Sequence, residues 1–594
     1  MNRTHFFYTL LAFQLLFILS CTSVEPPKEF PPLPTQHQLA WQELEYYLFI
    51  HFGPNTFTDV EWGDGREDPS VFNPTELNTD QWASIAKEAG MKGIIITAKH
   101  HDGFCLWPSE YSTHTVRESP WRDGKGDLLQ ELSQSCKKYD LQMGVYLSPW
   151  DQNHPTYNTA EYNQTFANTL TEVLTNYGPI FEQWFDGATD GSSNQVYDWD
   201  LFHQTVYKHQ PQAIIFSDVG PGARWIGNER GYAGETNWSK LNTKGFTPGA
   251  GSPDLKILNE GEKQGKEWIP GEVDVSIRPG WFYSPSTDDK VKTVDQLMDI
   301  YYASVGRNAN LLLNVPPNRK GLIHPTDSTR LMEFKKARDE AFQTNLALGA
   351  QAEASNTRGN AKQYQANNLF NGNKNSYWTT DNDITTASIE IQLPTITTFN
   401  SILLQEYIPL GQRITDFHIE YWNTDLNDWK TLSKATTIGY KRILRTPEVT
   451  TNKIKVVINN SLAEPILSNI ELYKSKKVAN FDTKQFNKIT LNKDEAIIQK
   501  LEKETTLNGF VFTPYPDNTN TTIQIYNFYT SLDGESWELI QSNASFKNIK
   551  NNPIPQTIDL GRTIKANYIK LEPLQLTRDN ITKYTYSALE VTPQ

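Results

Sequence analysis

Aromatic side chains lead up to a carboxylate in the stretch "FEQWFDGATD", residues 181–190, where the residue types could serve a reaction. Side chains alternate between the two faces of a strand, so Trp184 and Asp186 would point the same way. A carboxylate at the end of an apolar strand costs free energy unless its charge is used there. The alternative is an Asp that only starts a turn or caps the next helix.

Other apolar runs in the chain end on similar groups. Histidines, acids and aromatics follow or close these runs, namely His51, Glu61, His100, His101, Tyr146, Glu229, Glu235, Glu272 and Trp281. In a parallel barrel, catalytic groups gather at the carboxyl ends of the strands, so we expect these side chains to meet at one rim. Carboxylates, histidines and stacking aromatics are the groups that hydrolyse a sugar bond with two acids.

Motifs for other chemistries are missing from the sequence. His100 and His101 are adjacent, and neighbouring strand residues face opposite ways, so we expect no catalytic metal. There is no Gly-x-Ser-x-Gly elbow for a serine nucleophile and no glycine-rich phosphate loop. The net charge of −14 argues against nucleic acid as a partner, because phosphate binding needs clustered Lys and Arg.

The first 37 residues read as a targeting segment and a linker. Arg3 precedes an apolar run at 6–19 that is too short to cross a bilayer, and Cys21 follows it. Residues 1–21 resemble a bacterial lipoprotein signal with Cys21 as the lipid attachment site; an ordinary secretory signal is the alternative. The proline-rich residues 22–37 would then be a stiff spacer that holds the protein off a membrane. This predicts a bacterial cell envelope location, periplasmic or at the cell surface.

Strands and helices alternate from about residue 38 to about residue 345. Apolar strands are predicted at 46–53, 93–100, 143–150, 181–186 and 213–220, and the helices between them are amphipathic. Thr79 is the expected cap of one helix, and Cys136 is expected to be buried on the apolar face of the next. Such strands indicate a parallel sheet covered on both faces, and the length favours an α/β fold of the (β/α)₈ barrel type.

Beyond residue 346 the pattern changes to short alternating strands rich in Asn, Thr and Ser. Trp429 and Trp537 occupy matching places in two similar stretches, which indicates an internal repeat. We therefore predict one or two all-β sandwiches, at 346–476 and, in a divergent copy, at 477–594. If the barrel has its own core, we expect it to act on small substrates without the sandwiches; the alternative is that the sandwiches are structural partners it needs to fold.

Six motifs together resemble the α-L-fucosidases of glycoside hydrolase family 29: "FIHFGPNTF", "KHHDGF", "YLSPWD", "WFDGA", "RWIGNE" and "VSIRPGWF", in the family's order. The resemblance covers roughly residues 38–345. It implies a retaining mechanism through a covalent fucosyl-enzyme intermediate, with Asp186 as nucleophile. It implies Glu229 as acid/base, with Glu235 and Glu272 as alternatives. The residues of the last two motifs most resemble those of the branch that removes α1,3/4-linked fucose from Lewis-type glycans.

The same resemblance implies the roles of the remaining site residues and needs no cofactor for catalysis. Fucose hydroxyls would be bound by His51, Glu61, His100 and His101, Tyr146 and Arg224 would lie near the nucleophile, and Trp184 and Trp281 would pack on the apolar face of the sugar. The unit at 346–476 resembles discoidin or carbohydrate-binding modules, which often hold a structural Ca²⁺ in a loop.

Two other functions remain open at this stage. One is a different exo-glycosidase on the same barrel, and the other is a non-catalytic surface lipoprotein that only binds glycans. The presence of Asp186 together with a plausible second acid argues against the binding protein.

The lipid anchor gives the first prediction. Cys21→Ala should move the protein from the membrane fraction to the soluble fraction and leave the specific activity unchanged, because Cys21 precedes the linker. Fractionation followed by an activity assay measures both. A variant that still sediments with membranes would show that Cys21 is not the anchor.

Overall fold

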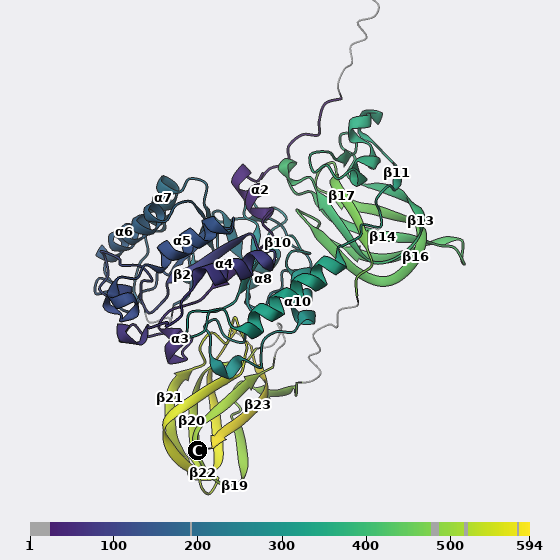
Figure 1. The fold of residues 1–594 in the computed structure, drawn as a ribbon. Helices are drawn as coiled ribbons and strands as arrows, with labels where there is room; N and C mark the ends of the chain where they lie inside the picture. Colours follow the sequence, from purple (N-terminus) through teal and green to yellow (C-terminus); the bar gives the residue numbers. More distant parts are fainter. Residues whose placement is uncertain (1–23, 190–192, 477–485, 516–520, 579–580, 594) are drawn as a thin grey trace, which may run out of the picture.

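The structure is a computed structural model, and it describes residues 24–189, 193–476, 486–515, 521–578 and 581–593. It consists of a barrel and two antiparallel β domains (Figure 1). Cys21 and the predicted signal peptide lie outside the described residues. Among the described residues, no helix is both long and apolar enough to cross a membrane.

Eight parallel strands close the barrel, in the order β1-β10-β9-β6-β5-β4-β3-β2. Their bounds are β1 Tyr46–Ile50, β2 Gly93–Lys99, β3 Gln142–Leu147, β4 Ile180–Trp184, β5 Ile214–Ser217, β6 Ala223–Trp225, β9 Gly271–Ser276 and β10 Ala309–Asn314. Strands β2, β9 and β10 are buried along their whole length, as the apolar run at 93–100 predicted for β2. The predicted barrel is therefore confirmed.

Helices surround the barrel and follow most of its strands. They are α2 Gln36–Gln42, α3 Asn55–Thr58, α4 Thr79–Glu88, α5 Leu128–Lys138, α6 Glu161–Asn176, α7 Trp199–His209, α8 Leu255–Glu260, α9 Val294–Ala303 and α10 Pro325–Ala341. Between β5 and β6 the fully described connection, residues 218–222, contains no helix, which departs from a strict (β/α)₈ pattern. A small hairpin of β7 (Lys240–Leu241) and β8 (Glu267–Trp268) lies in the excursion from β6 to β9.

The helix caps follow local sequence signals, with one correction. The N-cap of α4 is Asn78, whose side chain accepts a hydrogen bond from the backbone N–H of Gln81, so the expected cap at Thr79 was wrong by one residue. The Thr79 hydroxyl lies instead 2.8 Å from Ser135 Oγ on α5. Cys136 is buried as expected.

The two β domains have the same strand order. The first pairs its strands as β12-β17-β13-β16-β14-β15, with β11 beside β13, and the second as β18-β23-β19-β22-β20-β21. Bounds in the first are β11 Gln351–Ala354, β12 Trp378–Thr379, β13 Ala387–Glu406, β14 Ile414–Asn423, β15 Asp428–Ala435, β16 Arg442–Ser461 and β17 Ile466–Tyr473. In the second they are β18 Ile489–Asn492, β19 Ile497–Pro514, β20 Ile523–Ser531, β21 Glu538–Ser545, β22 Gln556–Leu576 and β23 Lys583–Pro593. Each domain has its own apolar core, so the internal repeat is confirmed.

The first sandwich shares apolar surface with the barrel. Leu403, Ile443 and Tyr473 are buried and belong to the same hydrophobic cluster as the barrel residues. Tyr473 packs edge-on against Phe342, just past the end of α10, with 5.2 Å between ring centroids. The first sandwich thus extends the barrel core, and the activity expected of the barrel without its sandwiches stays a prediction.

The proline-rich linker does not behave as a free spacer over its described part. Arg358 donates to the carbonyls of Glu25 and Pro26, and the backbone N–H of Phe30 donates to the Leu410 carbonyl. The Arg413 guanidinium donates to the Lys28 carbonyl. Residues 24–30 are therefore held along the first sandwich, which corrects the predicted spacer.

The shared core leads to a stability prediction. Ile443→Ala should reduce the free energy of unfolding by about 2–5 kcal/mol, because it leaves a cavity where the barrel and the first sandwich meet. Thermal unfolding followed by circular dichroism should show the barrel and this sandwich melting together. Ile396→Ala, at a position that is 70% exposed in the same sandwich, is the matched control and should change little. Equal losses in the two variants would contradict the shared core.

Candidate active site

A cavity of about 610 Å³ opens where the barrel strands end. Most of the predicted site residues line it, namely His51, His100, His101, Tyr146, Trp184, Asp186, Glu229 and Trp281. They come from segments that follow β1, β2, β4, β6 and β9 and from β3 and β4 themselves. The strand ends therefore bring together groups that lie far apart in the sequence, as predicted.

Asp186 lies two residues past the end of β4 and is about one fifth exposed to solvent. Its Oδ2 accepts a hydrogen bond of 2.8 Å from the Tyr146 hydroxyl, and its Oδ1 accepts one of 2.7 Å from the backbone N–H of Ala188. The pKa of Tyr146 is raised well above its ordinary value, mainly by burial and then by the charge of Asp186, so this phenol keeps its proton and donates. Two donors thus hold the carboxylate and leave it accessible from the cavity.

The two adjacent histidines both face the cavity. Strand β2 ends at Lys99, so His100 and His101 lie beyond it, where strand alternation does not apply. Their ring centroids are 4.1 Å apart, and His101 Nε2 lies 3.7 Å from Asp186 Oδ2. The assumption that these rings point to opposite faces was wrong. In the described part of the chain, no three His, Cys, Asp or Glu side chains gather as a metal site, and the expected Ca²⁺ of the first sandwich stays a prediction.

Burial keeps these imidazoles neutral. It lowers the pKa of His51 to about 3 and that of His101 to about 4, and the pKa of His100 also falls well below its ordinary value. His51 Nδ1 lies 2.9 Å from the side-chain oxygen of Asn314, which comes from β10. Neutral rings can both donate to and accept from sugar hydroxyls, whereas imidazolium could only donate.

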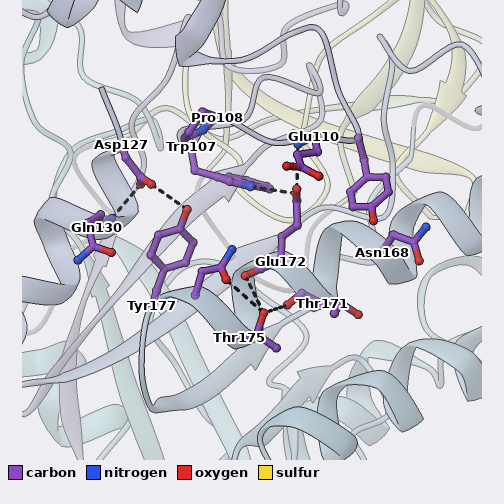
Figure 2. A pocket seen from close by; sticks show the side chains of 12 residues that line it. Trp107, Pro108, Glu110, Asp127, Gln130, Asn168, Thr171, Glu172, Thr175 and Tyr177 are labelled. Atoms are coloured by element: carbon purple, nitrogen blue, oxygen red, sulfur yellow. Dashed lines mark hydrogen bonds between the residues drawn. The ribbon is translucent and has the colours of Figure 1, made fainter. Parts of the chain in front are cut away.

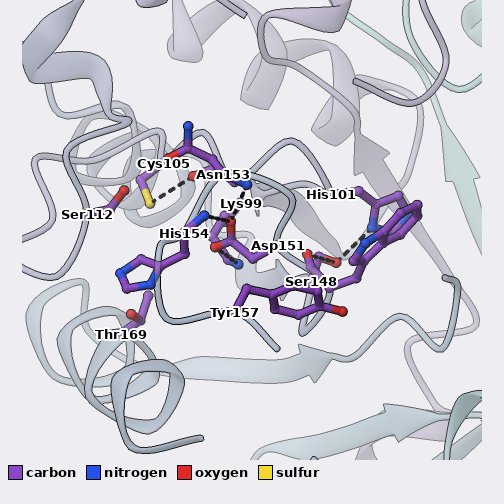
Figure 3. A network of polar contacts seen from close by, with 12 residues as sticks. Lys99, His101, Cys105, Ser112, Ser148, Asp151, Asn153, His154, Tyr157 and Thr169 are labelled. Atoms are coloured by element: carbon purple, nitrogen blue, oxygen red, sulfur yellow. Dashed lines mark hydrogen bonds and ion pairs between the residues drawn. The ribbon is translucent and has the colours of Figure 1, made fainter. Parts of the chain in front are cut away.

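A buried ion pair supports this part of the rim from behind (Figure 3). Lys99 Nζ lies 2.7 Å from Asp151 Oδ2, and both side chains are almost fully buried. Asp151 also accepts from the backbone N–H groups of Asn153 and His154. On the cavity side, His101 Nδ1 lies 2.8 Å from Ser148 Oγ. The network fixes the segments that follow β2 and β3, which carry His101 and Ser148.

Glu229 lies in the segment that follows β6, and its carboxyl group is bound on one oxygen. Oε2 accepts from Trp281 Nε1 at 2.8 Å and from Asn548 Nδ2 at 2.7 Å. The pKa of Glu229 is raised to about 8, mainly by burial, with a smaller contribution from the negative charge of Asp186. A carboxyl group with this pKa is protonated at neutral pH, whereas Asp186 sits among donors that suit a carboxylate.

Three predicted acids take supporting or remote positions. Glu61 is not part of the cavity lining; its carboxylate accepts from the backbone N–H of Trp281 and so supports that ring. Glu272 is buried beneath Trp184 and accepts from its Nε1 at 2.8 Å. Glu235 is 81% exposed and lies beside Arg307, away from the cavity. Of the three candidates for the acid/base, Glu229 is the one that lines the cavity.

Arg224 does not reach the nucleophile, and its expected place near Asp186 was wrong. Its guanidinium is buried and donates to the carbonyls of Leu258 and Ile269 and to the side-chain oxygen of Asn237. Side chains alternate along β6, so it is the neighbour Trp225 that lines the cavity.

Sequence reasoning missed several residues of the site. Trp225 Nε1 donates to Asp274 Oδ1 at 2.9 Å, and both residues line the cavity. Burial raises the pKa of Asp218, another lining residue, to about 6. The position of Asp274 on an apolar strand, "GEVDVS", was a usable signal. The closing segment, residues 546–552 of the second sandwich, lines the cavity up to Asn551, and its sequence carries no such signal.

A second hollow, of about 510 Å³, lies on the outside of the barrel beside α5 and α6 (Figure 2). Its central carboxylate, Glu172, accepts from Trp107 Nε1, from Ser109 Oγ and from the backbone N–H of Glu110. Asp127 likewise accepts from the Tyr177 hydroxyl. The polar groups in this hollow bond to one another, whereas Asp186 and Glu229 line the barrel cavity.

Comparison with known proteins fits this geometry. The family model described as alpha-L-fucosidase matches residues 35–336, and the model of the F5/8 type C domain matches twice, at 351–472 and at 475–587. The chain belongs to the α-L-fucosidase family. It is thus a glycoside hydrolase, and both C-terminal sandwiches of this fucosidase are discoidin domains.

Named relatives are similar to this fucosidase over most of its length. Alpha-L-fucosidase 1 of Arabidopsis thaliana is 42% identical over 80% of this chain and 94% of its own length. A solved putative alpha-L-fucosidase from Bacteroides ovatus is 38% identical, with a TM-score of 0.67, over 95% of this chain and 96% of that chain. A Ruminococcus gnavus GH29 fucosidase, solved in complex with fucose, is 34% identical with a TM-score of 0.70 over 76% of this chain and 97% of that chain.

Proposed function

We propose that this α-L-fucosidase is an exo-acting, retaining enzyme with Asp186 as nucleophile and Glu229 as acid/base. The observation that carries the proposal is the pairing of these carboxyl groups in one cavity with opposite environments. Asp186 accepts hydrogen bonds from Tyr146 and Ala188, whereas burial raises the pKa of Glu229 to about 8. Such a division between a carboxylate and a protonated acid is what a two-acid glycosidase needs.

The reaction then follows in two steps. Asp186 attacks the anomeric carbon of fucose while Glu229 gives its proton to the leaving oxygen, which forms a covalent fucosyl-enzyme intermediate. The Glu229 carboxylate next takes a proton from water, whose oxygen attacks the same carbon and releases Asp186. Tyr146 donates to Asp186 Oδ2 in the resting enzyme and so holds the nucleophile in place.

The sugar itself would be held by the rest of the rim. His51, His100 and His101 are neutral and line the cavity, so they can bond the fucose hydroxyls. Trp281 and Trp184 offer apolar faces for the ring and its methyl group. Glu61 accepts a hydrogen bond from the backbone N–H of Trp281. It would therefore act by holding Trp281 and not through a direct contact with the sugar.

For the substrate we propose fucosylated glycans with α1,3/4-linked fucose of the Lewis type. The "RWIGNE" and "SIRPGWF" motifs support this linkage, and the cavity of about 610 Å³ has room beyond one sugar for part of a branched leaving group. We further propose that a lipid on Cys21 tethers the enzyme to a bacterial cell envelope, which the apolar run at 6–19 supports.

The acid/base assignment predicts a pH dependence. The raised pKa of Glu229 means that its protonated, proton-donating form is present below about pH 8 and is lost as the pH rises through that value. The kcat/KM for an oligosaccharide should therefore fall above about pH 8. Glu229→Gln should remove this basic limb when an activated aryl fucoside is used, because that leaving group scarcely needs a proton. A basic limb that persists unchanged in Glu229→Gln would assign it to another group.

Product analysis tests nucleophile and linkage together. Wild-type enzyme should release fucose from Lewis a, Lewis x and 3-fucosyllactose and act poorly on the α1,2-linked blood-group H structure. Asp186→Asn keeps the shape of the side chain and should lower kcat on the good substrates by about 10³-fold or more. Preference for the blood-group H structure would refute the linkage, and a fully active Asp186→Asn variant would refute the mechanism.

A further inference from the structure

The second sandwich lies beside the barrel (Figure 1). Its closing segment, which lies between β21 and β22 in the chain, lines the barrel cavity. Two apolar side chains anchor this segment in the core of its own domain. Phe546 stacks on Phe512 and on Tyr526, with ring centroids 4.6 and 4.3 Å apart, and Ile549 is buried in the same cluster. The segment is therefore fixed by its domain and does not hang freely over the cavity.

Polar groups of the closing segment bond to the barrel. Lys547 Nζ donates to the carbonyl of Trp62, in the segment after β1. Asn552 Nδ2 donates to the carbonyl of Pro279, after β9. The backbone N–H of Glu229 donates to the Asn551 carbonyl at 3.3 Å. Three separate parts of the barrel rim are thus tied to one segment that lies more than 250 residues later in the chain.

Asn548 makes the contact that matters most for the reaction. Its Nδ2 donates to Glu229 Oε2, the same oxygen that accepts from Trp281 Nε1. With two N–H donors on Oε2, the proton of the neutral acid has to be on Oε1, which is then the oxygen that can give it away. The two bonds also fix the rotation of the carboxyl group, since both come from partners held by packing.

We infer that the closing segment is part of the active site: it forms the wall on the leaving-group side of the cavity, and Asn548 is a positioning residue that orients the Glu229 carboxyl. This inference rests on the proposed role of Glu229. The leaving group that such a wall accommodates is a hydroxyl-rich sugar, because Asn548, Asn551 and the nearby Gln524 and Ser545 offer amide and hydroxyl groups to the cavity.

Backbone geometry decides which variants can be used. Asn548 has a φ of 53°, in the left-handed region that Asn, Asp and Gly tolerate and most other residues do not. Asn548→Gly removes the side chain without backbone strain. Asn548→Asp keeps the shape and replaces the donor with a negative charge beside Glu229. Both variants are made in the full-length protein, and circular dichroism verifies that they fold.

Leaving-group dependence is the main readout. In Asn548→Gly, kcat on a fucosylated oligosaccharide should fall by about tenfold or more, because part of the general-acid contribution of 10²–10⁴ is lost. The kcat/KM on an activated nitrophenyl fucoside, which reports only the steps up to departure of the leaving group, should change by less than about threefold, since that leaving group departs without a proton. In Asn548→Asp, the basic limb of kcat/KM should move to higher pH, because loss of the donor and a new like charge both raise the pKa of Glu229.

Asn552→Ala is the matched comparison, since the same amide on the same segment bonds to Pro279 and not to Glu229. Asn567→Ala, on the second sandwich but outside the cavity lining, should behave as wild type. Equal losses on both substrates in Asn548→Gly, or a loss matched by Asn552→Ala, would reduce the segment to a docking contact and overturn the positioning role. An unshifted basic limb in Asn548→Asp would do the same.

Failure of this inference and failure of the proposed function can be told apart. If Glu229→Gln keeps full rate on the oligosaccharide, the acid/base assignment is wrong, and that result comes from a barrel variant alone. If Glu229→Gln loses that rate while both Asn548 variants match wild type, the mechanism holds and the closing segment has no part in it.

Discussion

The site depends on one constraint, which is that several carboxyl groups are buried in the barrel and have lost their hydrating water. Burial favours the uncharged form of a carboxyl, and each group needs a donor to replace its hydration. In this protein the donor is repeatedly an indole N–H, in the pairs Trp41 with Glu182, Trp184 with Glu272, Trp225 with Asp274 and Trp281 with Glu229. An indole supplies one donor and no charge, so it satisfies an acid without forcing it to ionise. This suits a cavity in which one carboxyl must remain protonated beside another that is ionised.

The sequence predicted those parts of the site that follow from local pattern. The apolar runs predict where the strands end, and a parallel barrel brings the carboxyl ends of its strands together. This predicts that Asp186, His51 and His101 lie at one rim. Register within a short strand is harder to predict: β6 has only three residues, and a shift of one exchanges Arg224 for Trp225 at the cavity. The assumed opposite facing of His100 and His101 failed for a related reason, because β2 ends one residue before them.

The contacts between domains could not be predicted from the sequence. Asn548 meets Glu229 across 319 residues, and nothing in "FKNIKNN" distinguishes it from an ordinary polar turn. The two sandwiches share one strand order, yet they contact the barrel in different ways. The first continues the apolar core through Ile443 and Tyr473, whereas the second contributes polar groups at the cavity. A repeated fold therefore predicts topology but not the surface that a copy presents to its neighbour.

The described N-terminal segment has a geometric consequence for an enzyme tethered at Cys21. The Val24 carbonyl accepts a hydrogen bond from Gln363, and the next residues are bound along the first sandwich, so the proposed lipid on Cys21 is separated from a fixed point on the protein by three Cα-to-Cα steps. Fully extended, they would reach about 10 Å. A connection this short would keep the first sandwich next to the bilayer and restrict the rotation of the whole enzyme. The catalytic barrel would then sample one orientation relative to the lipid surface instead of sweeping freely through the space around its anchor.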